Sequence, residues 1–453
     1  MAIRRIHASI ALTVVGASLV LTACGTAPAR TSAPAAAVSM PSHPPASGGP
    51  ATTGCGPQPP RYAWAVDVTT AGRVVWKTPL PTRNGGFSTV AQPLVAGPVA
   101  VLAQDGIVHG LDLGDGHPLW SWTGGQDVFG MWRWGALVAV LTDQVSSHSR
   151  LTGLDAATGQ VRWSLRLPVR GLLGDQAATA DGGLAMITTA GVLQVVSLAD
   201  GRIRWRRTAG ASPALTAAGQ LVIFSINGRL TGYDDRTGQP RWTTGGLPGQ
   251  PTLQVAGSLV LVTSNAQGPG ITTALTAVLP ATGRIAWRFD TGEPLTVLSA
   301  GPAGLTVAAY VFSRRLYLLD PRTGRLRWQA DTFVTEATIP LVTSTDVVLA
   351  EGQPPSTRLV DRNAADGRVR WQDTLAAPPA GTQQVLQAGP LAVLQTDPSR
   401  PGSPAPLLAY QLTSGRPAWR VDMPTFVAAS PVLAPGHVLV QPADLMSTCA
   451  VAG

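Results

Sequence analysis

The sequence predicts an all-β fold, a β-propeller made of four-stranded blades. The first indication is a glycine followed four residues later by a tryptophan, a pair that occurs nine times. Successive tryptophans of these pairs are 44, 43, 42, 37, 45, 41, 43 and 48 residues apart. A repeat of about 40 residues with apolar, β-branched segments between turns is typical of propeller blades. The pairs are Gly72/Trp76, Gly116/Trp120, Gly159/Trp163, Gly201/Trp205, Gly238/Trp242, Gly283/Trp287, Gly324/Trp328, Gly367/Trp371 and Gly415/Trp419.

Composition also favours strands and turns over helices. The chain of 453 residues contains 50 glycines and 39 prolines. Lys77 is its one lysine, and glutamate occurs only at positions 293, 336 and 351. Helices are usually rich in lysine and glutamate, so the scarcity of both argues against a helical domain. A chain of this length can bury a large core as a single repeat architecture.

One repeat shows the expected order of strands. A strand of small residues is predicted at 338–345, and an apolar strand follows at 346–352. The third and fourth strands are clearest in the preceding repeat, at 314–320 and 325–330. Between these two lies a turn in which Asp320 can accept backbone hydrogen bonds, Pro321 presets φ and Gly324 can adopt the left-handed conformation. The third and fourth strands are therefore predicted to form a hairpin.

The strand after this turn alternates in character. Leu326 and Trp328 should share one face, and Arg325 and Arg327 the other, because successive side chains of a strand point to opposite faces. We therefore expect the first face to pack and the second to contact water.

The repeated hairpin resembles a known family of repeats. The pattern Ala-x-Asp-x-x-Thr-Gly-x-x-x-Trp is similar to the tryptophan-docking repeat of pyrroloquinoline-quinone-like propellers. Such propellers occur in quinoprotein dehydrogenases and in the lipoprotein subunit of the outer-membrane barrel assembly machine. The resemblance covers nearly all of residues 62–445 and implies that all nine tryptophans of the pairs dock against neighbouring blades. The copies that fit the pattern most fully are Asp155/Thr158/Gly159/Trp163, Asp234/Thr237/Gly238/Trp242 and Asp320/Thr323/Gly324/Trp328.

The number of blades and the closure of the ring are separate questions. Eight complete units follow Trp76, and residues 425–444 read as the first two strands of another. The missing third and fourth strands are available near the amino end, at 62–68 and 73–80. A blade shared between the two ends would close the ring without a free edge. The repeat count gives nine blades, but we favour eight, with one accessory hairpin, because members of the resembling family usually have eight.

The amino-terminal segment reads as an export signal. Arg4 and Arg5 precede an apolar run at 10–21, and small residues lead to Cys24. Residues 21–24, Leu-Thr-Ala-Cys, resemble a bacterial lipobox, in which the cysteine is diacylated and becomes the first residue. We therefore expect a signal peptide at 1–23, a lipidated Ala/Pro/Ser-rich tether at 24–61 and the propeller domain at 62–453. Ordinary cleavage, or retention of the segment as a signal anchor, is the alternative. The composition of the tether is typical of a disordered segment.

The remaining cysteines flank the repeats. Cys55 precedes the first repeat and Cys449 follows the last. An even pair in an exported protein reads as a disulfide, so we predict a Cys55–Cys449 bond across the shared blade. Two unpaired thiols are the alternative.

Charge limits the classes of partner. The formal net charge is +8, of which the expected signal peptide carries two arginines. This excess favours anionic surfaces such as lipid headgroups or acidic wall polymers. A nucleic-acid partner is disfavoured because the chain carries an export signal and lacks a basic run with interleaved aromatic residues.

Catalytic motifs are scarce. The quinoprotein reading implies a quinone and a metal held by acidic side chains, but Glu351 is the one glutamate that we consider as a ligand, and an isolated glutamate at a strand end is usually a solvated loop residue. The Asp-Thr-Gly triplet at 290–292 matches an aspartic-protease motif, which needs a second copy that the sequence lacks. The recurring turn aspartates are expected to serve their turns rather than a metal.

The sequence therefore favours a non-enzymatic, lipid-anchored extracytoplasmic propeller. It would be held at the cell membrane by its lipid, bind no cofactor and act as a scaffold for an envelope protein or an anionic wall polymer. The candidate partner loops are the Pro-rich insertions at 265–270, 351–356 and 397–406. A pyrroloquinoline-quinone-dependent dehydrogenase is the alternative function.

Overall fold

The computed structural model describes most of residues 61–441, within the compact unit that includes residues 60–447. The described ranges are 61–67, 72–80, 91–104, 106–125, 127–143, 148–167, 172–209, 214–226, 228–247, 251–264, 274–309, 314–334, 338–353, 356–379, 383–396, 405–423 and 431–441. Within these ranges, no helix has the length and apolar character that crossing a membrane requires. Cys24, Cys55 and Cys449 lie outside them, so the lipid and the disulfide stay predictions.

The described part of the chain forms nine antiparallel four-stranded sheets, which we call blades 1 to 9 in ring order. Blade 1 consists of β3 (Leu94–Ala96), β4 (Val99–Gln104), β5 (Ile107–Asp112) and β6 (Pro118–Thr123). Blade 2 consists of β7 (Val128–Trp134), β8 (Leu137–Asp143), β9 (Ser149–Asp155) and β10 (Val161–Arg166). Blade 3 consists of β11 (Leu172–Ala180), β12 (Gly183–Thr188), β13 (Val192–Ser197) and β14 (Ile203–Thr208).

The middle of the chain continues the same pattern of four consecutive strands in a sheet. Blades 4 to 6 consist of β15 (Ala214–Ala218), β16 (Leu221–Ile226), β17 (Arg229–Asp234), β18 (Pro240–Thr244); β19 (Pro251–Ala256), β20 (Leu259–Ser264), β21 (Leu275–Val278), β22 (Ile285–Phe289); and β23 (Leu295–Gly301), β24 (Gly304–Ala309), β25 (Arg315–Leu319), β26 (Leu326–Asp331).

A small extra sheet accompanies the last two blades made of consecutive strands. Blades 7 and 8 consist of β28 (Leu341–Val342), β29 (Asp346–Glu351), β30 (Arg358–Asn363), β31 (Val369–Thr374); and β33 (Leu386–Ala388), β34 (Leu391–Gln395), β35 (Ala405–Gln411), β36 (Pro417–Met423). The extra sheet is a parallel pair of β27 (Thr338–Ile339) and β32 (Gln383–Gln384), which precede blades 7 and 8 respectively. This pair ties the beginnings of the two blades together.

Blade 9 is shared between the two ends of the chain. Its strands are β37 (Val432–Ala434) and β38 (His437–Val440) from the carboxyl end, and β1 (Arg61–Asp67) and β2 (Val74–Leu80) from the amino end. Antiparallel pairing of β1 with β38 places Ala65 opposite Leu439. The predicted shared blade is thus confirmed, but the preference for eight blades was wrong. Every counted hairpin forms a full blade of its own, so none is an accessory.

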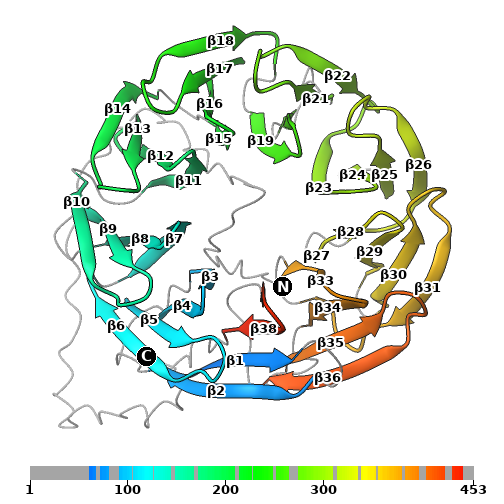
Figure 1. Cartoon of the computed structure of the whole chain (residues 1–453). Helices are drawn as coiled ribbons and strands as arrows, with labels where there is room; N and C mark the ends of the chain where they lie inside the picture. Colours follow the sequence, from blue (N-terminus) through cyan, green and yellow to red (C-terminus); the bar gives the residue numbers. More distant parts are fainter. Residues whose placement is uncertain are drawn as a thin grey trace, which may run out of the picture. The chain divides into compact units, whose positions relative to one another are not determined.

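The blades stand around a ring with their fourth strands outside. Figure 1 shows β6, β14, β22, β31 and β36 on the rim and the first strands toward the middle. The apolar core lies between blades, because each hydrophobic cluster draws on two neighbours. Leu318 of blade 6, for example, packs in one cluster with Val347 and Leu349 of blade 7. A blade therefore has no complete core of its own.

A β-bulge changes the expected alternation on the fourth strands. In blade 6, Leu318 pairs with Trp328 and Leu319 with Leu326, so Arg327 is the extra residue. Trp328 is buried as predicted, but Leu326 is 44% exposed rather than packed on the same face. The bulge explains this difference, because one additional residue rotates the preceding part of the strand away from the core.

The tryptophan rings lie on glycines of the following blade. Gly367 of blade 7 has φ +75°, and a Cβ added to it would lie 2.6 Å from the Trp328 ring of blade 6. The same contact recurs around the ring, with glycine φ values between +58° and +75°. Glycine is required at these sites for its φ and for the space that the ring occupies. The contacts are Trp76 on Gly116, Trp120 on Gly159, Trp163 on Gly201, Trp205 on Gly238, Trp242 on Gly283, Trp287 on Gly324, Trp328 on Gly367, Trp371 on Gly415 and Trp419 on Gly72.

The nine tryptophans are not equally covered, although the repeat alone gives no reason to expect a difference. Three of them, Trp120, Trp205 and Trp242 of blades 1, 3 and 4, are only partly buried. Each still makes the ring contact with its glycine, so partial exposure does not remove the stack. The buried rings, with 6% to 9% exposure, are Trp76, Trp163, Trp287, Trp328, Trp371 and Trp419.

The indole N–H groups add a polar contact to eight of the nine stacks. Nε1 of eight tryptophans donates to a backbone carbonyl of the next blade at 2.6 to 3.1 Å. The acceptor always lies three residues before the stacked glycine, as with Trp328 and Ala364. For Trp419 this position is Thr69, which is outside the described residues. The acceptors are Leu113, Ala156, Leu198, Asp235, Pro280, Pro321, Ala364 and Leu412.

The third-strand residue paired with each tryptophan is usually small. Six of these nine residues are glycine or alanine, and two more are Val195 and Leu318. The ninth is Asp361 in blade 7, which pairs with Trp371. The six small residues are Ala65, Gly110, Gly153, Gly232, Ala277 and Ala409.

Asp361 is therefore a carboxyl group at a position built for small or apolar side chains. It is 0% exposed, and neither carboxyl oxygen has a hydrogen-bond partner. Nε of Arg370, the nearest cation, lies 3.8 Å from Oδ2. Burial, followed by repulsion from Asp346, raises the pKa of Asp361 to about 7. Its ionised form is destabilising because it is desolvated and poorly paired.

Replacing Trp328 by alanine should lower the free energy of unfolding by about 3 to 5 kcal/mol, the usual cost of removing a buried tryptophan. The ring contact with Gly367 and the hydrogen bond to Ala364 are both lost. Denaturant unfolding measures the change, with Leu326→Ala on the same strand as the control because Leu326 is exposed. An unchanged midpoint for Trp328→Ala would refute the docking role.

Asp361→Ala should stabilise the protein by on the order of 2 kcal/mol at about pH 8, and by less at about pH 5. The folded state holds the Asp361 proton more tightly than the unfolded chain, whose pKa is near 3.8. Stability is thus lost as pH rises from that value through about 7, and the alanine variant avoids this loss. Thermal melts at both pH values provide the measurement, with exposed Asp366→Ala as the control. An equal gain at both values would contradict the assignment.

Candidate functional site

The turn aspartates bind their own hairpins, as the sequence predicts. Oδ1 of Asp320 accepts hydrogen bonds from the backbone N–H groups of Arg322 and Thr323, each at 3.0 Å, and from the Thr323 hydroxyl at 3.1 Å. Asp155 and Asp234 make the equivalent contacts in blades 2 and 4. These carboxylates therefore serve the turns.

An arginine directly before the tryptophan completes each of these turns. Nη2 of Arg327 lies 2.8 Å from Oδ2 of Asp320, and this contact is the largest cause that lowers the Asp320 pKa to about 2. Sequence alternation assigned Arg327 to the water-facing side and missed the pair. Because Arg327 is the bulged residue, its side chain reaches back across the hairpin. The equivalent pairs are Arg162–Asp155 and Arg241–Asp234.

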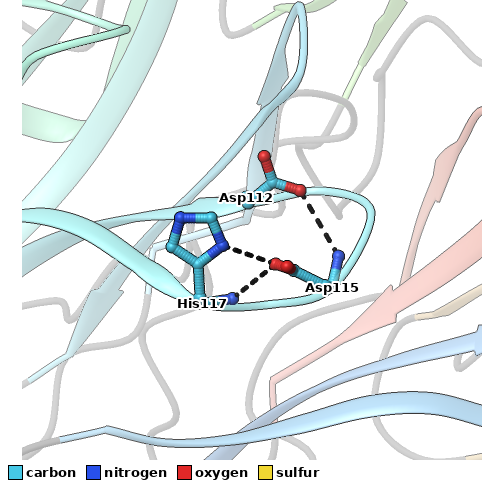
Figure 2. Close-up of side chains that lie close together, drawn as sticks. All are labelled: Asp112, Asp115 and His117. Carbon is cyan, nitrogen blue, oxygen red and sulfur yellow. Dashed lines mark hydrogen bonds and ion pairs between the residues drawn. The ribbon is translucent and has the colours of Figure 1, made fainter.

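The turn of blade 1 brings together the one group of possible metal ligands in the described part of the chain. Figure 2 shows Asp112, Asp115 and His117 on this turn, and their ligand atoms lie within 4.8 Å of one another. Oδ1 of Asp115 accepts the His117 backbone N–H at 3.0 Å and lies 2.7 Å from its Nδ1, and these hydrogen bonds lower the Asp115 pKa. Asp112 accepts the Gly114 and Asp115 backbone N–H groups. The group serves an exposed turn like those of other blades.

Blade 7 departs from the common turn and connects its arginine differently. Asn363 stands where blades 1, 2, 4 and 6 have an aspartate. Arg370, the residue before Trp371, binds Asp346 on the second strand instead. Asp346 also accepts hydrogen bonds from the Thr343 and Thr345 hydroxyls, at 2.7 and 2.6 Å. Blade 7 thus holds Asp346 and Arg370 as a partly buried pair close to Asp361.

A second buried pair lies on the other side of blade 7. Arg362 binds Glu351 through Nε at 2.6 Å and Nη2 at 2.8 Å, and Thr332 donates to the same carboxylate at 2.7 Å. Arg362 also donates to the Gly367 carbonyl. The sequence offers Glu351 as a candidate metal ligand, with a solvated loop residue as the expected alternative. It is buried, and its two oxygens are engaged by Arg362 and Thr332.

The contact between blades 7 and 8 contains further polar groups. The Trp371 ring stacks on the Tyr410 ring of blade 8, with centroids 6.2 Å apart, and its Nε1 donates to Leu412. Burial, together with the charge of nearby Asp373, raises the Tyr410 pKa. Asp361 and Asp346 lie beside this contact, because Asp361 pairs with Trp371 and Asp346 binds the preceding Arg370. These charged residues distinguish blade 7 from the other blades.

The other predicted site residues are distributed around the ring. Asp290 of the Asp-Thr-Gly triplet accepts the Gly292 backbone N–H at 2.9 Å and forms a turn. The loop at 265–270 lies outside the described residues, as do positions 354–355 and 397–404 of the other two loops. The structure therefore brings no set of predicted catalytic side chains together in the described part of the chain.

Two curated relatives are both named outer membrane protein assembly factor BamB. The protein from Burkholderia pseudomallei is 24% identical over 201 residues, which cover 39% of this chain and 49% of the relative. The protein from Moranella endobia is 24% identical over 332 residues, which cover 67% of this chain and 83% of the relative. The chain thus spans about half of the length of the first relative.

Comparison with solved structures supports the architecture. A eukaryotic initiation factor matches with a TM-score of 0.57 at 12% identity, over 82% of this chain and 100% of the other. At this identity the likeness shows a common fold alone.

The family model described as outer membrane protein assembly factor BamB matches residues 63–175 and 189–332. The matched residues contain the tryptophan-docking repeats of blades 1 to 6 and make up more than half of the chain. The protein therefore belongs to the BamB-like family of pyrroloquinoline-quinone-like propellers.

Proposed function

We propose that this protein is a non-enzymatic scaffold of the cell envelope. It is tethered on the extracytoplasmic side of the membrane by a lipid at Cys24 and binds another envelope protein during its assembly. The observation that carries this proposal is the family match over more than half of the chain, because the family model and two relatives bear the name of an assembly factor. Function on a shared fold still depends on this chain's own surface.

The described side chains are consistent with a scaffold. In blade 7, Asp346 pairs with Arg370 and Glu351 pairs with Arg362. The turn aspartates bind their own hairpins, as Asp320 does. A ring fixed by tryptophan stacks holds its loops at constant spacing, which suits recognition of a partner. The insertions at 265–270, 351–356 and 397–406 are the proposed partner loops, because they differ between repeats.

Photo-crosslinking from Ser403, in the third of these loops, should capture a protein of envelope assembly in intact cells. Thr208, exposed on the outer strand of blade 3, provides the control position. The measurement is mass spectrometry of the crosslinked products. Recovery of glycan polymers alone, or the same proteins from both positions, would count against a protein-binding scaffold.

Cys24→Ser should move the protein from the membrane fraction to the soluble extracytoplasmic fraction, since it removes the proposed acylation site. Fractionation with immunoblotting measures this shift. Cys55→Ser is the matched control, because it removes a thiol outside the lipobox. The membranes are washed with high salt before the comparison, because salt releases proteins that are held by charge alone. Retention of Cys24→Ser in the salt-washed membrane fraction would count against lipid anchoring.

A further inference from the structure

Five consecutive blades share an exposed pair of residues directly after the turn glycine. In blades 5 to 9 this glycine is followed by an arginine and then by an apolar residue. We call the five pairs the basic arc. They are Arg284/Ile285, Arg325/Leu326, Arg368/Val369, Arg416/Pro417 and Arg73/Val74.

The basic arc lies on one face of the ring. Each pair opens the fourth strand of its blade, immediately after the turn from the third strand. Figure 1 shows these fourth strands, β22, β26, β31, β36 and β2, following one another along the right-hand and lower rim. Because the pairs share the same end of equivalent strands, they can meet a flat surface together.

The apolar members of the arc contact water rather than the core. The bulge before each docking tryptophan leaves Leu326 44%, Val369 46% and Val74 39% exposed. Ile285 is 36% exposed. An exposed aliphatic side chain recurring at one position of successive blades marks an interaction surface more strongly than scattered ones do.

Positive charge is concentrated in the same blades. From the first turn residue to the docking tryptophan, blades 5 to 9 contain eight arginines and three aspartates. The same segments of blades 1 to 4 contain five arginines and six aspartates. The excess of five positive charges therefore belongs to one part of the rim, whereas the other part has an excess of one negative charge.

Four of the five arginines of the basic arc make no ion pair with a described carboxylate. Arg73, Arg284, Arg325 and Arg416 form no ion pair with a carboxylate in the described part of the chain. Arg368 lies 3.6 Å from Asp366, but its side chain is 87% exposed. Such cations remain available to an external anion, because an exposed pair of this kind contributes little.

We propose that the basic arc is an interaction surface for the anionic phospholipid headgroups of a membrane. The inference rests on the proposed function, which holds the protein beside a membrane. Each arginine supplies attraction to the anionic surface, and the adjacent apolar side chain enters the boundary between headgroups and acyl chains. A soluble polyanion would neutralise the arginines but leave the apolar side chains in water.

The rest of the ring lacks this combination. At the equivalent positions, blades 1, 2 and 4 have His117/Pro118, Gln160/Val161 and Gln239/Pro240. Blade 3 repeats the arginine as Arg202, but its partner Ile203 packs against the core. The arc is therefore a property of five adjacent blades rather than a requirement of the fold.

Vesicle flotation tests the proposal with the expected mature chain, residues 24–453, carrying Cys24→Ser, which lacks both the apolar signal segment and the expected acylation site. Vesicles contain one part phosphatidylglycerol and two parts phosphatidylcholine, and phosphatidylcholine alone is the reference. We expect binding that depends on phosphatidylglycerol and falls with salt. The triple variant Arg284→Gln, Arg325→Gln, Arg416→Gln should weaken it roughly 100-fold, because each basic residue near such a surface contributes about fivefold.

A matched control separates this surface from net charge. Arg166→Gln, Arg202→Gln and Arg229→Gln remove the same three charges from exposed positions of blades 2, 3 and 4, and should leave binding unchanged. Equal weakening by the two triple variants would overturn the proposal, as would equal binding to both vesicle types.

A second variant separates a membrane from a soluble polyanion. Leu326→Gln should weaken flotation but leave binding to soluble polyphosphate unchanged, and its side chain is exposed in the folded protein. Full retention of vesicle binding by Leu326→Gln would assign the arc to a soluble polyanion and reject the membrane. Because every sample lacks Cys24, flotation measures binding through the basic arc alone. A negative result would therefore reject the arc and would not bear on lipid anchoring at Cys24.

Discussion

The stacking of each tryptophan on a glycine of the next blade is the contact on which the ring depends. The glycine supplies a positive φ and leaves room for the indole, and the indole N–H satisfies a carbonyl of the same turn. One contact thus fixes the conformation of the turn and the distance between two blades, and it gives a buried carbonyl its hydrogen bond. Because no blade has a complete core, packing between neighbours supplies the stability that a single four-stranded sheet lacks.

This dependence explains how much the sequence could predict. Glycine and tryptophan four residues apart mark the contact itself, so the propeller, the hairpins and the shared blade followed from spacing. The β-bulge left no separate signal, and alternation therefore placed Leu326 in the core and Arg327 in water. The predicted blade number was wrong for another reason. The repeats themselves number nine, as the blades do, whereas the prediction of eight rested on the number usual in similar proteins.

The candidate site was less predictable than the fold. The pairing of Arg370 with Asp346, and of Arg362 with Glu351, joins residues of different strands whose spacing has no repeat signature. Only the strand register of the structure shows that these residues contact one another and that blade 7 differs from the other blades here. The same comparison defines the basic arc, where arginine and an apolar residue replace neutral or partly buried residues found elsewhere. In a repeat protein, differences between copies carry the information about function.

The shared blade has a consequence for the order of folding. β1 is made first, yet its antiparallel partner β38 ends at Val440, near the carboxyl end. Residues such as Ala65 and Leu439 can therefore meet only after nearly the whole chain has left the ribosome. Contacts of such long range fold slowly, so the first two strands need protection from aggregation until the ring closes. The ring can therefore close only when the chain has been made as far as β38, because a shorter chain leaves β1 without this partner strand.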